Sequence, residues 1–392
     1  MTDLYGMMID ALKDRGCLYV EKFAVPYICS IGAHIFNLHN HRNKILFEAG
    51  RLYNSRVHIM FVAPPGYSKT FFQDQFLMAD WGLLWGTPIK IGQEGYMTEA
   101  GWVGSVTQVN GEIVPIMGAA YHYREAIVGI EEFSALVVAM RAQHSSALDT
   151  AMLTSLDTGR VRKRLRGGPI SYETQVTLWC ATQPARFDLT SGLGRRFVFI
   201  SFVPRRKDAE QLKYARRNAI NIRPDIPTLN LVRSRVRAKL DEVENIKFVT
   251  FEEELYETLD KLKVEFFEEI LYERIALGYN VMRFEGGKVL EVEVDKECER
   301  ILRLEKMWRD EVKRGSEFAL VLQVIREHGG TIDIGELREE MLRFGLDWSQ
   351  STSLVFSLVK VGVLGMKGGV VWVRGERCAR HNLRPEKDMG RG

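Results

Sequence analysis

Apolar positions along the chain change their spacing several times, and each change marks a predicted element. Two short apolar runs, 57–62 and 126–130, have the composition of strands that are buried on both faces. A third such run covers 175–181. Between 204 and 314 the chain is charged and its apolar residues recur at helical spacing. Strands separated by helical stretches predict an α/β fold with a parallel sheet.

A Pro/Gly turn follows the first of these runs and ends in Lys-Thr. Its residues are Pro65, Gly66, Tyr67, Ser68, Lys69 and Thr70. In a P-loop, backbone N–H groups and a helix N-terminus cradle phosphate oxygens, the Lys reaches the β- and γ-phosphates, and the hydroxyl holds Mg²⁺. The general pattern G-x-x-x-x-G-K-[ST] fails here, because Ala63 and Ser68 stand at its glycine positions.

Two adjacent acids, Glu131 and Glu132, end the second apolar run. In a nucleotide hydrolase one such acid supports the Mg²⁺ shell and the other orients or deprotonates the attacking water. The alternative is an ordinary acidic helix start, where carboxylates favour the helix dipole. The loop upstream, at a spacing typical of α/β proteins, favours the nucleotide site.

Two hairpins are predicted between and after these motifs. Asn110-Gly111 lies between alternating apolar runs, which is the strongest short-range hairpin signal. The second predicted hairpin, 158–172, interleaves basic with apolar residues around a Gly-Gly-Pro turn. Its central cations are Arg162, Lys163, Arg164 and Arg166. Such a run can grip nucleic-acid phosphates, although most charge runs are solvated surfaces.

The loop and the acidic motif together resemble the AAA+ ATPases and, more narrowly, the mini-chromosome maintenance (MCM) helicases. The family's loop, Gly-Asp-Pro-Gly-x-Ala/Ser-Lys-Ser, shares the spacing of residues 65–70, and its acidic motif ends Ile-Asp-Glu-Phe where this chain has residues 130–133. The family also carries hairpins at both predicted places. The resemblance spans roughly residues 50 to 200 and, weakly, the C-terminus.

The resemblance implies an ATP and Mg²⁺ site. Residues 65–70 would bind the triphosphate, with Thr70 and Glu131 at the metal and Glu132 activating water. Gln183, which follows the run 175–181, stands where the family has the Asn that senses the γ-phosphate. Asn110 and the basic hairpin would contact DNA in a central pore.

Arginines complete the implied site. Arg196 resembles the family's arginine finger, which reaches the neighbouring subunit's γ-phosphate, and Arg195 is the near alternative. A finger that acts in trans implies a homo-oligomer, in this family a hexameric ring. Arg274 resembles a second sensor on a lid helix, although a salt-bridged helix surface fits it equally well.

The order of elements divides the chain into five segments. We expect a helical lead-in at 1–50, an AAA+ α/β core at 51–204, a helical lid at 205–314, a winged helix at 315–374 and a basic tail at 375–392. In the lid, 289–294 is either a small strand or a linker. The winged helix would consist of helices at 318–328, 335–343 and 349–361, a strand at 331–334 and a wing at 364–373. Ser349 is the predicted cap of its third helix, whose apolar face is expected to hold Leu354, Phe356, Leu358 and Val359.

That third helix is polar without being basic, since Gln350 to Ser353 are uncharged and Lys360 is its cation. Docking of a protein, such as a replication-initiation partner, is therefore as reasonable as contact with DNA.

Composition limits the other classes. The chain has 392 residues, of which 46% are hydrophobic, and a net charge of +3, so it holds real cores without a polybasic coat. Its five cysteines have no C-x-x-C spacing, and the histidines near 34–41 have no ligand pattern. No apolar stretch is long enough for a bilayer and no signal peptide is apparent, which predicts a cytoplasmic or nucleoid-associated protein.

The sequence thus predicts an ATP-hydrolysing, ring-forming DNA motor, such as a replicative helicase or translocase of a plasmid, virus or integrated element. One alternative is an AAA+ protein remodeller or transcription activator, in which the insertion near Trp102 grips a protein. The other is a non-catalytic DNA-binding scaffold whose ATPase site is degenerate.

Overall fold

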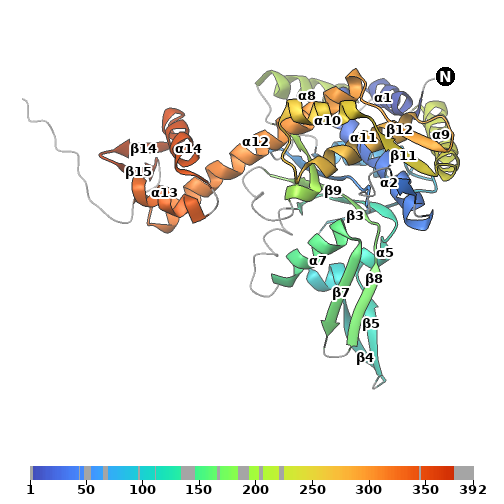
Figure 1. Cartoon of the computed structure of the whole chain (residues 1–392), viewed down its shortest axis with the longest axis horizontal. Coiled ribbons are helices and arrows are strands. Elements are labelled where there is room, and N and C mark those ends of the chain that lie inside the picture. The colour runs from blue at the N-terminus through green and yellow to red at the C-terminus, as the bar shows by residue number, and fades with distance from the viewer. Residues whose placement is uncertain are drawn as a thin grey trace, which may run out of the picture. The chain divides into compact units, whose positions relative to one another are not determined.

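The structure, a computed structural model, divides into two compact units, Met1–Val312 and Lys313–Gly392 (Figure 1). It describes residues 3–43, 45–47, 54–64, 69–95, 98–110, 112–133, 146–165, 168–183, 194–202, 206–219, 225–343 and 346–374.

A five-stranded parallel sheet forms the centre of the first unit, which confirms the predicted α/β class. Its strands are β2 (His58–Val62), β3 (Lys90–Glu94), β6 (Ala126–Ile130), β9 (Thr177–Thr182) and β10 (Phe197–Ser201), in the order β10-β2-β9-β6-β3. Every residue of β2, β6, β9 and β10 is buried. These strands are apolar at consecutive positions because both faces of the sheet are covered.

The lead-in contains α1 (Leu4–Asp14), the π-helix η1 (Val20–Ala24) and α2 (Val25–Asn43), of which α2 packs on β2 of this sheet. Polar side chains of α2 reach the sheet directly: Ser30 Oγ donates to Val57 O at 2.6 Å, and His34 Nδ1 lies 2.8 Å from Thr177 Oγ1. The helix α3 (Lys69–Leu77) follows β2 and contacts β3 and β9.

The segment predicted as a lid is largely helical, but it also carries strands. Its helices are α8 (Arg206–Ala219), α9 (Ile226–Glu244), α10 (Glu253–Leu262), α11 (Glu269–Arg283) and α12 (Lys296–Glu327). Of the two alternatives for 289–294, a small strand or a linker, the structure has the strand, β12 (Val289–Val292). It joins β1 (Leu46–Phe47) and β11 (Phe248–Phe251), which the sequence did not predict, in a parallel sheet of order β1-β11-β12. This small sheet ties the lead-in to the helical segment.

The helices α2 and α11 approach each other at two glycines. A Cβ added to Gly278 would lie 2.1 Å from Cys29 O, and one added to Gly32 would lie 2.1 Å from Gly278 O. Only glycine permits this backbone contact, because the space of its missing side chain is filled by the other helix.

Both predicted hairpins are confirmed. The first consists of β4 (Gly104–Val109) and β5 (Glu112–Met117), with Asn110 at φ 52° in the turn. The second, the basic hairpin, consists of β7 (Arg160–Leu165) and β8 (Gly168–Glu173). Figure 1 shows them extending side by side from the sheet, with β8 against β4 and β5. The helices α4 (Glu99–Val103), α5 (Ala119–His122) and α7 (Ser146–Asp157) flank their bases.

The second unit has a core of its own. It contains the end of α12, β13 (Thr331–Asp333), α13 (Ile334–Arg343), α14 (Trp348–Lys360), β14 (Leu364–Lys367) and β15 (Val370–Val373). The three strands form an antiparallel sheet in the order β13-β15-β14. The predicted elements are present in the predicted order, although the helix expected at 318–328 is the end of α12.

Two predictions about α14 are wrong. Its cap is Asp347, whose side chain accepts from Gln350 N while the Gln350 side chain accepts from Asp347 N, so the helix begins before Ser349. Such a reciprocal capping box satisfies two backbone donors at once. Phe356 was expected in the core, but its side chain is 49% exposed.

Within the described residues, no helix is both long enough and apolar enough to cross a membrane.

Candidate functional site

Three strands of the central sheet end beside one another at its carboxyl edge. β9 lies between β2 and β6, with Val62 opposite Thr182 and Ile130 opposite Cys180. Beyond the strand ends, Ala63 N donates to Thr182 O at 3.2 Å. This order sets Gln183, after β9, between the turn that follows β2 and the acids that follow β6. Ligands of open α/β sheets bind at such carboxyl edges.

Lys69 is the first residue of α3 and folds back over the end of β2. Its Nζ donates to Ala63 O at 2.8 Å and to Pro64 O at 3.1 Å. Burial lowers the pKa of Lys69, and the charge of Glu132 opposes that shift. The ammonium and the Glu132 carboxylate are therefore electrostatic neighbours. Pro65, Gly66, Tyr67 and Ser68 lie outside the described residues.

Acids gather on the other side of this edge. Glu131 is exposed and Glu132 is half-buried directly after β6. Burial raises the pKa of Asp74, Glu131 raises it further, and a hydrogen bond from Gln93 opposes both. Asp74 was missed from the sequence, although it lies four residues after Thr70 and so shares a face of α3 with that residue.

Arg196 lies at the opposite edge of the sheet. It ends the short turn Gly194–Arg196 that leads into β10, and the first residue of β10 pairs with His58 at the start of β2. Five strand residues at 3.3 Å each separate the two edges by roughly 16 Å. Arg196 therefore cannot serve the Lys69 site of its own chain. Its Nη2 donates to Asp157 Oδ2 at 2.8 Å.

Arg274, on α11, is a second arginine near Arg196. It is 7% exposed, and its Nε has no hydrogen-bond partner among the described residues. Burial lowers the pKa of Arg274 to about 10, with Asp157 and Glu273 opposing the shift and Arg196 adding to it. Arg274 is thus an electrostatic neighbour of Arg196 and not of Lys69.

The Arg196 turn, Gly194–Arg196, is held from α12 by a residue that the sequence did not single out. Arg309 donates to Gly194 O at 3.1 Å and to Phe197 O at 2.7 Å, so its guanidinium brackets the turn. Glu305 Oε1 accepts from Arg309, and Glu305 Oε2 accepts from Phe199 N at 2.8 Å. Arg195 is exposed, with its guanidinium 5.9 Å from the centre of the Phe267 ring.

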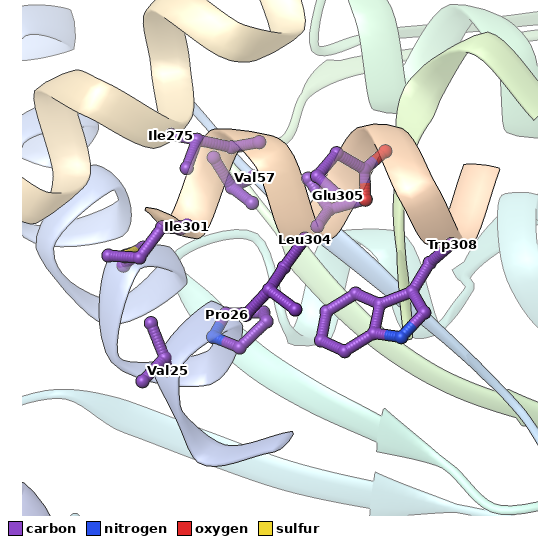
Figure 2. Close-up of a pocket in the computed structure, with 10 residues that line it drawn as sticks. Val25, Pro26, Val57, Ile275, Ile301, Leu304, Glu305 and Trp308 are labelled. Atoms are coloured by element: carbon purple, nitrogen blue, oxygen red, sulfur yellow. The ribbon is translucent and has the colours of Figure 1, made fainter. Parts of the chain in front are cut away.

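Glu305 also borders a pocket between α2 and α12 (Figure 2). The other lining side chains are mostly apolar, among them Val25, Pro26, Ile301 and Leu304. Both Glu305 oxygens are already engaged by Arg309 and by the backbone of β10. Both oxygens of the Glu305 carboxylate are therefore already hydrogen-bonded within the protein. The pocket lies where α2 and α12 pack against each other.

The remaining predicted residues lie in the two hairpins, and their side chains differ in exposure. Arg162 and Arg164 are exposed, whereas Lys163 Nζ is paired with Glu99 Oε1 at 2.8 Å. Asn110 is exposed at the tip of the first hairpin, and Arg166 lies outside the described residues. The first hairpin also exposes apolar side chains, namely Val109, Ile113, Val114 and Ile116, each between 40% and 54% exposed.

No protein-family model matches the chain, and no curated protein matches it.

Proposed function

We propose that the protein is an ATP-hydrolysing DNA motor of the AAA+ class that resembles the MCM helicases and works as a ring, in the cytoplasm, in replication. The observation that supports this proposal is that the candidate residues fall at the two opposite ends of the parallel strands. Lys69, Glu131, Glu132 and Gln183 follow adjacent strands at one edge, and Arg196 precedes β10 at the other.

ATP and Mg²⁺ fit the residues at the carboxyl edge. The first turn of α3 contains no acid of its own, so the partial positive charge of the helix N-terminus favours an anion. Lys69 supplies a cation there, and with residues 65–68 it would hold the triphosphate. Thr70 and Glu131 supply the hard oxygen ligands that Mg²⁺ prefers. The metal supplies charge neutralisation at the phosphates when it is bound.

The remaining groups at this edge are placed for water and phosphate. Glu132 is a half-buried carboxylate beside Lys69, where it can orient or deprotonate the attacking water. Gln183 follows β9, the strand between β2 and β6, and is the proposed γ-phosphate sensor.

The arginines require a neighbour. Because Arg196 lies at the edge away from Lys69, we assign it, as the arginine finger, to the nucleotide of an adjacent protomer. Arg274, which is 7% exposed, is the proposed second sensor. Arg195 remains the alternative finger, since it is exposed at the same turn. A site shared in this way makes an oligomer, in the resembling family a hexamer, the active form.

DNA contact is assigned to the basic hairpin and to Asn110. Exposed Arg162 and Arg164 offer charge for phosphates, and the adjacent apolar side chains of β5 offer surface for unstacked bases. Residues 205–314 would be the AAA+ lid, and residues 315–374 would be a winged helix. In that unit α14 exposes Trp348 and Phe356, which favours docking of a replication-initiation partner over DNA.

The test compares ATP turnover with and without single-stranded and forked DNA, for the unchanged protein and for Glu132→Gln. We expect DNA to stimulate turnover and the substitution to abolish it. Turnover that survives Glu132→Gln contradicts the catalytic assignment and favours the DNA-binding scaffold.

A protein remodeller is the second candidate, because Val109, Ile113, Val114 and Ile116 expose an apolar hairpin surface. Trp102 itself is fully buried, and its Nε1 donates to Ser155 Oγ, so it cannot grip a client. Turnover that is indifferent to nucleic acid but stimulated by an unfolded polypeptide favours this candidate. Loss of strand displacement with retained ATPase activity in Arg166→Ala favours the motor.

A further inference from the structure

Asp157 stands at the junction between the basic hairpin and the Arg196 turn. It is the last residue of α7, and β7 begins three residues later at Arg160. Its carboxylate accepts the 2.8 Å bond from Arg196 Nη2. The Arg196 side chain is 17% exposed and that of Asp157 47%, so the pair lies at the boundary of core and solvent.

The backbone around Asp157 is anchored by a buried arginine. Arg56 Nη2 donates to Ser155 O and Leu156 O at 3.0 Å each, and Asn54 Nδ2 donates to Asp157 O at 2.6 Å. Arg56 is fully buried, so its two bonds form away from water. The end of α7 is thus rigidly seated where the chain enters the hairpin.

The other end of the hairpin meets the same arginine. Arg56 Nη1 donates to Val176 O at 2.8 Å and to Thr174 O at 3.3 Å, in the segment that leads from β8 to β9. Thr174 N also donates to Gly159 O at 2.7 Å, which closes the base of the hairpin. Both ends of the basic hairpin are therefore held at one junction around Arg56, and a displacement of the hairpin would act on it. Asp157 is the residue of this junction that contacts Arg196.

We propose that Asp157 is a positioning residue that couples DNA held by the basic hairpin of one protomer to the nucleotide that Arg196 of that protomer serves in its neighbour. The inference rests on the proposed function. The ion pair has two arrangements: the guanidinium is held by Asp157, or it turns toward the neighbour's phosphates. DNA on the hairpin shifts the balance between them, and by linkage nucleotide changes the affinity for DNA by the same factor.

The experiment measures that factor in the full-length protein without requiring turnover. The affinity for fluorescent single-stranded DNA is determined by anisotropy, with and without a non-hydrolysable ATP analogue and Mg²⁺. The variants are Asp157→Asn, which keeps the shape and removes the charge, Asp157→Glu, which keeps the charge, and Arg196→Ala. Glu299→Gln is the matched control, because Glu299 is a 43% exposed carboxylate paired with Arg303 away from both elements.

We expect the analogue to change DNA affinity by at least about fivefold in the unchanged protein and in the control, in line with typical coupling energies. In Asp157→Asn and in Arg196→Ala the ratio should fall to within about twofold of one, and the double variant should add nothing, since both remove one interaction. Asp157→Glu should restore part of the ratio. The ratio of ATP turnover with and without DNA should follow the same order.

An unchanged ratio in Asp157→Asn overturns the inference while the proposed function stands. Loss of the ratio in both Asp157→Asn and Glu299→Gln also overturns it, because the effect is then not specific to the junction. Absence of ATP and DNA binding in the unchanged protein is a different result, and it overturns the proposed function itself. Thermal melting of each variant separates loss of coupling from loss of folding.

Discussion

At the scale of single residues, the buried ion pair of Glu305 and Arg309 holds the turn that carries Arg196. Arg309→Met should destabilise the protein by about 3–5 kcal/mol, because Glu305 is left buried without its partner and the carbonyls of Gly194 and Phe197 lose their donor. Urea unfolding measures this free energy. Arg303→Met is the control, since Arg303 is exposed, and a loss below 1 kcal/mol in Arg309→Met contradicts the assignment.

Two buried histidines make stability depend on pH. Burial lowers the pKa of His34 to about 3 and that of His58 well below its usual value of 6.5. His58 Nδ1 accepts from Leu178 N and Nε2 lies 3.2 Å from Leu156 O, an arrangement that suits the neutral ring. The unfolded chain then binds more protons below pH 6.5, so stability is full above that pH and is lost as the pH falls.

The expected slope is about 1.4 kcal/mol per pH unit for each such histidine between roughly pH 6 and 4. Urea unfolding at several pH values measures it, and His34→Asn should remove one histidine's share. If the slopes of His34→Asn and the unchanged protein coincide, the ring is not held neutral in the fold.

Several residues of the site were within reach of sequence reasoning and others were not. Lys69, Glu132 and Gln183 follow apolar runs, and the parallel sheet brings strand ends together, so local pattern was enough. Asp157 and Arg309 act through partners that are distant in sequence, and no local pattern announces them. Asp347 does carry a local signal, the Asp-x-x-Gln spacing of a capping box, which is more specific than the single Ser349.

At the scale of elements, the crossing of α2 and α11 depends on glycine. Gly278→Ala should destabilise the protein by at least about 1–3 kcal/mol, because the new Cβ would lie 2.1 Å from Cys29 O and the helices must separate. Gly315→Ala on α12 is the matched control: a Cβ there meets nothing within 4 Å, and alanine favours the helix by up to about 1 kcal/mol. Denaturant unfolding should give opposite signs, and equal signs contradict the crossing.

The basic hairpin gives a salt-dependent prediction. Arg162→Ala and Arg164→Ala should each weaken binding of single-stranded DNA and lower the slope of log affinity against log salt by about 0.7, the effect of one phosphate contact. Lys163→Ala should change it less, because Lys163 is already paired with Glu99. Fluorescence anisotropy at several salt concentrations measures the slopes, and equal losses in all three variants contradict the unequal exposure.

Strands and hairpins could be predicted from the sequence where one local pattern was strong. Four strands of the central sheet, β2, β6, β9 and β10, are largely apolar, and both hairpins carry turn residues between extended runs. The edge strand β3, with Lys90 and Glu94 at its ends, carries no such signal. The strands β1 and β11 escaped because β1 has two residues and β11 four, too few for a period, and they form through pairing with distant segments.

At the scale of the whole molecule, the proposed function requires an ATPase site that two protomers complete. The sequence suggested this division through the place of Arg196, and the order of the parallel strands explains it: residues before a strand and residues after it lie at opposite edges of the sheet. The proposed coupling through Asp157 would then give each protomer a path between its hairpin and its neighbour's nucleotide.

Mixing two inactive variants tests this division most directly. Lys69→Ala removes the phosphate-binding cation but keeps Arg196, and Arg196→Ala does the reverse. Each should be inactive alone as an ATPase. In an equal mixture, half of the sites keep Lys69 and half of those meet an intact Arg196, so turnover should return to about one quarter of the unchanged protein's value if each site acts alone. A mixture that stays as inactive as its components would contradict the shared site.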